Sequence, residues 1–77
     1  MHDLHLANQI VKMAKKYAKG RSIKSVSIEL GNIIEHNETI QPENLRHNIN
    51  LLLPEVRINI TPVNVQGVWK LKEIEVE

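Results

Sequence analysis

Ile23-Lys24-Ser25-Val26-Ser27-Ile28-Glu29-Leu30 is the stretch that decides the fold. Its apolar residues from Val26 to Leu30 occupy every second position, and polar residues fill the positions between them. This alternation predicts a β-strand with one buried face and one face toward solvent. Gly31-Asn32 is expected to end the strand. A strand that is buried on one side needs other elements to cover that side, so the flanking sequence should supply helices.

Amphipathic helices are predicted on both sides of this strand in the chain. Residues 4 to about 19 place apolar residues at helical spacing, with Asp3 as the expected N-cap and Gly20 as the C-terminal stop. The second helix begins at Pro42, which suits a first helical turn, and ends before Pro54. Its apolar stripe consists of Leu45, Ile49, Leu52 and Leu53. Between strand and helix, Ile33 and Ile34 are expected to pack, and residues 35–39 to form a polar loop.

Two further strands are predicted after the second helix. The first covers residues 56–61, and Pro62 is acceptable at its end or on a sheet edge. A short turn at residues 64–67 leads to the last strand, residues 68–76. In that strand Trp69 and Leu71 share one phase, whereas Ile74 and Val76 share the other. A one-residue bulge near Lys72-Glu73 would bring all four to one face. We expect these two strands to pair as an antiparallel hairpin.

The element order α-β-α-β-β predicts an α+β fold. Two helices that both cover one sheet should lie on the same face, which gives a two-layer domain with a three-stranded sheet. Residues 1–77 are too few for more than one domain. The uncovered face of the sheet is expected to be polar and solvated. Its members would be Ser25, Ser27, Arg57, Asn59 and Thr61.

Composition excludes several classes of protein. The chain has 77 residues and no cysteine, so neither a disulfide framework nor a cysteine-ligated zinc site is possible. We expect a cytoplasmic protein, because the sequence shows no signal peptide and no apolar run near the roughly 20 residues that cross a bilayer. No nucleophile–base pair, phosphate-binding glycine loop or carboxylate pair is apparent, so we do not expect an enzyme. A chain this small would gain stability from forming a homo-oligomer.

The first residues, Met1-His2-Asp3, could chelate a transition metal through local geometry alone. The α-amino group and the His2 amide nitrogen would close a five-membered ring with a metal, and the His2 amide and imidazole Nδ1 a six-membered one. A fourth ligand would come from Asp3, from His5 or from outside the chain. Nitrogen-rich tetragonal sites favour Ni(II) or Cu(II). The simpler interpretation is that His2 and His5 are solvated and that Asp3 only caps the helix.

A cluster of basic residues offers a different interpretation. Its members are Lys12, Lys15, Lys16, Lys19, Arg21 and Lys24. They could bind nucleic acid, but the net charge is only +1, with 10 basic and 9 acidic residues. The two aromatic residues, Tyr17 and Trp69, are too few for a base-stacking platform. A solvated helix face is the simpler interpretation of the cluster.

Several short motifs, in order, resemble the HypA family of nickel-incorporation proteins. Met1-His2-Asp3-Leu4, followed by Leu6-Ala7, is similar to the start of that family. Val26-Ser27-Ile28-Glu29-Leu30-Gly31 resembles its first strand, and Pro42-Glu43-Asn44-Leu45-Arg46 the opening of its second helix. Ile74-Glu75-Val76-Glu77 resembles its usual ending. Together these motifs cover nearly the whole chain.

The resemblance implies a protein that binds Ni(II) and delivers it during the maturation of nickel–iron hydrogenase or urease. The implied ligands are the His2 imidazole and main-chain atoms of Met1 and Asp3. The implied partners are the HypB GTPase and a hydrogenase large subunit, with no membrane or nucleic acid. The family's four-cysteine zinc domain is missing, because a short turn near residues 62–68 replaces it, so no zinc is expected. The alternative is a metal-independent interaction module that uses an exposed strand edge or the second helix; a nucleic-acid binder is the third hypothesis.

Overall fold

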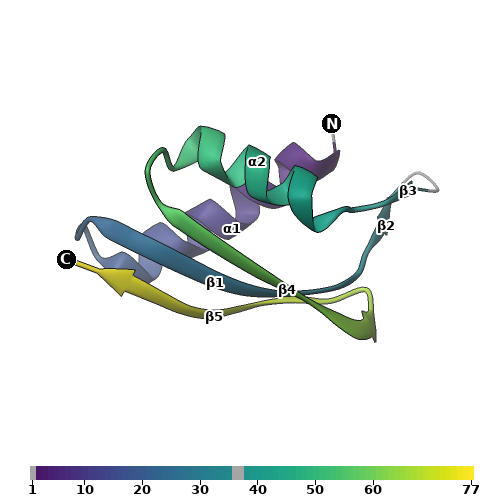
Figure 1. Ribbon diagram of the computed structural model, residues 1–77. Coiled ribbons are helices and arrows are strands. Elements are labelled where there is room, and N and C mark those ends of the chain that lie inside the picture. The colour runs from purple at the N-terminus through teal and green to yellow at the C-terminus, as the bar shows by residue number, and fades with distance from the viewer. Residues whose placement is uncertain (1, 36–37) are drawn as a thin grey trace.

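The computed structural model describes residues 2–35 and 38–77, and it describes the side chains of these residues except 2, 3, 34, 35 and 38. Two helices pack against each other and cover one face of a three-stranded sheet (Figure 1). Helix α2 lies over strand β4, and helix α1 lies over strand β5. The predicted two-layer α+β fold and its element order are therefore confirmed.

Helix α1 spans His2–Ala18 and begins earlier than predicted. Asp3 therefore lies inside the first turn, and the prediction that it is the N-cap is wrong. The reason is that a helix can begin on any residue with good propensity, and an acidic residue in the first turn still favours the positive end of the helix dipole. Gly20 does stop the helix, because Lys19 and Gly20 adopt positive φ angles of 53° and 84°.

Helix α2 spans Pro42–Leu52, as its apolar stripe predicts. Leu45 and Ile49 are completely buried, and the Leu53 N–H donates to the Ile49 carbonyl at 2.8 Å to close the last turn. The Asn50 side-chain amide donates to the Val56 carbonyl at 2.9 Å. This bond fixes the chain where it leaves the helix and enters the next strand.

The sheet has the strand order β4-β1-β5, with β1 at the centre. Strand β1 (Ile23–Asn32) pairs parallel to β4 (Arg57–Gln66) on one side and antiparallel to β5 (Trp69–Val76) on the other. The prediction that the last two strands form a hairpin is wrong. Helix α2 connects β1 to β4 as a crossover, which makes those two strands parallel neighbours, and β5 then takes the free edge of β1. Strand β4 is also longer than predicted, because Pro62 is tolerated on an edge strand. The turn predicted at residues 64–67 is therefore wrong, and only residues 67–68 connect β4 to β5.

The chain crosses the end of β1 when it passes from β4 to β5, and Gly31 lies under that crossing. The Gly31 N–H donates to the Val68 carbonyl at 2.8 Å, and the Gly67 N–H donates to the Asn32 carbonyl at 2.9 Å. A Cβ atom on Gly31 would overlap the carbonyl oxygens of Val65 and Val68. Gly31 thus lies inside β1, whose last residue is Asn32, and it provides the space that the crossing needs.

The bulge predicted in the last strand is confirmed. Ser27 pairs with Glu73 and Ile28 pairs with Leu71, so Lys72 has no partner in the ladder. The extra residue brings both halves of β5 into one phase. The four residues that share the helix side are all half-buried: Trp69, Leu71, Ile74 and Val76.

Part of the predicted polar loop forms a second, very short ladder. Strand β2 (Ile34–Glu35) pairs antiparallel with β3 (Glu38–Thr39), and residues 36–37 lie outside the described residues. Ile33 packs on the core as predicted, whereas the Ile34 side chain is not among those described.

The uncovered face of the sheet is polar, but its two serines on β1 are less exposed than predicted. Arg57, Asn59 and Thr61 are exposed and Ser27 is half-buried, whereas only 6% of the Ser25 surface is accessible. The reason is that the Ser25 hydroxyl donates to Glu75 Oε1 at 2.7 Å, so the neighbouring strand covers it.

Candidate functional site

The predicted metal ligands lie at the start of α1. The backbones of His2 and Asp3 belong to its first turn, their side chains are not among those described, and Met1 lies outside the described residues. The first four N–H groups of any helix have no intrahelical acceptor. The amide nitrogens of His2 and Asp3 are therefore not needed for the helix ladder, so a site that uses backbone nitrogens fits this position.

His5 lies in the first turns of the same helix and is exposed. Its Nε2 is 3.4 Å from the side-chain nitrogen of Gln9, which is a weak contact at the helix surface. His47 is also exposed, on α2. Among the side chains that the structure describes, no three His, Asp or Glu residues come together as a metal site. The His2 and Asp3 side chains are outside that set, so the fourth ligand of His2 stays a prediction.

The basic residues are all exposed, which agrees with a solvated helix face and a solvated turn. Lys12, Lys15, Lys16 and Lys19 lie on α1 or directly after it, and Arg21 and Lys24 follow. On the sheet, Lys72 Nζ lies 3.8 Å from Glu29 Oε2, and both side chains are well exposed to solvent. An exposed pair of this kind contributes little to stability.

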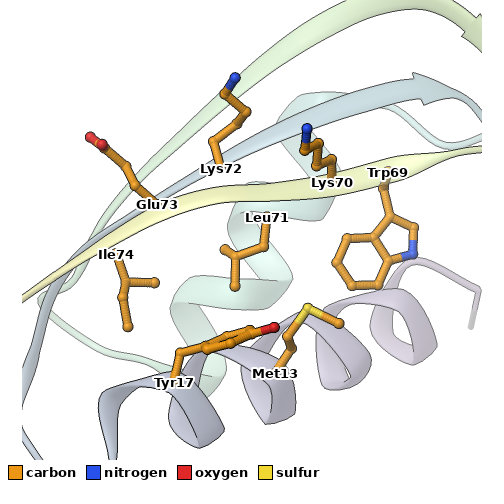
Figure 2. A pocket seen from close by; sticks show the side chains of 8 residues that line it. All are labelled: Met13, Tyr17, Trp69, Lys70, Leu71, Lys72, Glu73 and Ile74. Atoms are coloured by element: carbon orange, nitrogen blue, oxygen red, sulfur yellow. The ribbon is translucent and has the colours of Figure 1, made fainter.

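A groove between α1 and β5 was not predicted. It has a volume of about 510 Å³, and Figure 2 shows how its walls are built. Trp69, Leu71 and Ile74 point from β5 toward the helix, and Met13 and Tyr17 point from the helix toward β5. Met13 remains 37% exposed and Tyr17 63% exposed, although both follow the helical spacing of core residues.

The groove is apolar on its inner walls and charged on its outer side. Lys70, Lys72 and Glu73 belong to the same stretch of β5 but point away from α1 (Figure 2). The side chains that point into the groove are mostly apolar, so the groove is suited to bind apolar side chains. The phase of the bulged strand is the sequence signal that could have revealed its β5 wall.

Comparison with known proteins adds no relative. No protein-family model matches the chain, and no curated protein is significantly similar to it. The resemblance to the HypA family therefore rests on the short motifs and stays a prediction. In the part of the chain that the structure describes, no helix has the length and apolar character needed to cross a membrane.

Proposed function

We propose that this chain is a cytoplasmic Ni(II)-binding protein that carries nickel for the maturation of nickel–iron hydrogenase or urease and has no enzymatic activity of its own. The observation that carries the proposal is the position of the His2 and Asp3 backbones in the first turn of α1, directly after Met1 in the sequence. The amide nitrogens at such a position have no helix acceptor and are free for coordination.

Nickel would be held here as cargo and not as a resident cofactor. His2 would supply its imidazole, and Met1 and Asp3 would supply main-chain atoms. The positive end of the helix dipole disfavours a bare cation but favours deprotonated amide nitrogens. Binding of Ni(II) by these nitrogens would therefore release their protons. Binding should therefore weaken as the pH falls, which gives a simple route to release.

The partners follow from the family resemblance. The HypB GTPase and a hydrogenase large subunit are the proposed partners. Without cysteines the chain cannot build the zinc domain of the family. The docking surface proposed for these partners therefore lies on the α+β domain.

Isothermal titration of untagged protein with Ni(II) tests the proposal. The unmodified chain should bind one Ni(II), and His2→Ala should weaken binding more than about tenfold, because an imidazole ligand is lost. His47→Ala is the matched control, since His47 is an exposed histidine far along the chain on α2, and it should bind as the unmodified chain does. Adding residues before Met1 should also weaken binding, because the α-amino ligand is then blocked. Equal, weak binding by the unmodified chain and His2→Ala would refute the proposal.

The second candidate is an interaction module that does not need metal. The groove between α1 and β5 favours it, because this groove leaves Met13 and Tyr17 partly exposed beside an edge strand. Substitution of His2 would then leave partner capture unchanged. No comparable observation favours a nucleic-acid binder: the exposed lysines have only two aromatic residues in the whole chain to accompany them.

A further inference from the structure

Among the described residues, no strand pairs with the outer side of β5. In the three-stranded sheet it pairs with β1 only, so its outer backbone groups face away from the sheet. Such an edge can accept another strand through main-chain hydrogen bonds. From the charge pattern of this edge, we propose that the strand it accepts is β5 of a second copy of this chain, so that two sheets join into one six-stranded sheet.

The sequence of β5 is complementary to itself when it runs antiparallel. Lysines lie in its first half and glutamates in its second half, and apolar residues are spaced equally on both sides of the centre. A two-fold axis between positions 72 and 73 would give matching pairs throughout, as an interface between identical surfaces requires. The opposed residues would be Trp69 with Val76, Lys70 with Glu75, Leu71 with Ile74, and Lys72 with Glu73.

The bulge makes this register possible. In a regular strand Trp69 and Val76 are seven positions apart and would point to opposite faces. Because Lys72 is an extra residue in the ladder, both of them lie on the helix side here. Two copies in this register would therefore place apolar residues together on the helix side and opposite charges together on the open side.

Neighbouring registers do not match in the same way. A shift of two residues in one direction would place Leu71 opposite Lys72. A shift in the other direction would place Ile74 opposite Glu73. Opposite charges across a pair of strands stabilise the pairing, and an apolar residue against a charged one does not. Charge and polarity thus favour one register, in which β5 complements β5 of a second copy.

Burial of the apolar residues of the groove is a second reason for this pairing. The helix-side residues of β5 are only half-buried, so α1 does not cover the whole strand. In the dimer, the groove of each copy would be closed by the other copy, which would remove Met13, Tyr17 and the apolar residues of β5 from water. Burial of apolar surface is favourable, and a single chain of 77 residues has a small core. This inference does not depend on nickel binding.

The test measures the mass of the full chain by sedimentation equilibrium, without nickel, from about 10 μM to about 1 mM. The unmodified chain should show a reversible monomer–dimer equilibrium. Lys70→Glu should weaken the dimer at least about tenfold, because two opposite-charge pairs become like-charge pairs in each dimer. The double variant Lys70→Glu/Glu75→Lys should restore the dimer, because the pairs then match again with their signs exchanged. Arg57→Glu on the edge strand β4 is the matched control and should leave the dimer unchanged.

Amide hydrogen exchange of the unmodified chain gives a second measurement that needs no variant. Protection should rise with protein concentration in β5 and not in β4. A monomer at every concentration, failure of the double variant to restore the dimer, or protection that rises in β4 instead would each overturn the proposal.

Discussion

The two edge strands of the sheet differ in how readily they can pair with a strand from another chain. Both flank the same central strand, but β4 carries Pro62, which removes a backbone donor, and its exposed side chains on the open face are mostly uncharged. Strand β5 has no proline and carries a bulge between a basic and an acidic half. Edge strands are usually protected from other chains by proline, charge or a bulge. Strand β4 follows this rule, whereas in β5 the bulge and the charges give a pattern that another copy can match.

The difference between the edges depends on how the chain moves from one to the other. Strands β4 and β5 are consecutive in sequence, but they are not hydrogen-bonded to each other because β1 lies between them. The connection passes over Gly31, and the two hydrogen bonds at the crossing hold it there. If β4 and β5 had paired as a hairpin, β1 would lie at an edge of the sheet and one of these two strands would lie at its centre.

The largest expected effect comes from filling the space under the crossing. Gly31→Val would force the carbonyl oxygens of Val65 and Val68 away from β1. We expect a loss of about 3 kcal/mol or more in the free energy of unfolding, because backbone must move to relieve the overlap. Urea denaturation would measure it.

Gly20→Ala is the control for this substitution. Gly20 has a positive φ of 84° but nothing within 4 Å of the added methyl group. Its cost should be about 1 kcal/mol, from backbone conformation alone. A Gly31→Val variant no less stable than Gly20→Ala would mean that the chain does not cross β1 at this point, and the comparison between the edges would lose its basis.

A smaller effect is expected from the difference in burial between the apolar residues of the two edge strands. Ile58 on β4 is 5% exposed, whereas Ile74 on β5 is only half-buried. Ile58→Ala should lower the free energy of unfolding by about 2–4 kcal/mol, and Ile74→Ala by about 1 kcal/mol, because less area leaves water at the second site. Both should be measured at low protein concentration, where the chain is monomeric. Equal losses would show that α1 covers β5 as completely as α2 covers β4.

The sequence predicted which face of each strand is buried more reliably than it predicted which strands lie side by side. Alternation in β1 and the phase break in β5 identified the buried side of each strand and the bulge, because side-chain direction depends on local spacing. Alternation contains no information about which strand lies beside which, so the hairpin prediction failed. The crossing over Gly31 depends on residues more than 30 positions away in the chain and could not be predicted locally.

In the candidate sites, too, features that depend on local spacing could be predicted, and contacts between distant parts of the chain could not. The first turn of α1 could be anticipated from the helical spacing after Asp3, although the helix begins before the predicted cap. The groove needs Met13 and Tyr17 beside β5, and helical spacing contains no information about which strand lies beside a helix. Ser25 was predicted to be solvated because its partner Glu75 is 50 positions away, and only the sheet order brings them together.

The smallest expected effect tests whether the bulge acts through its position or through its charge. Lys72 Nζ lies 3.8 Å from Glu29 Oε2, and the Lys72 side chain is 49% exposed. Lys72→Ala keeps the extra residue and removes only the charge, so the free energy of unfolding should change by less than about 0.5 kcal/mol. Deletion of residue 72 keeps the neighbouring charges but shifts Trp69 and Leu71 to the opposite face from Ile74, and should therefore cost far more. Thermal denaturation of both variants at low and high salt would compare them. A large, salt-dependent loss for Lys72→Ala would mean that the ion pair, and not the phase of the strand, is what this edge requires.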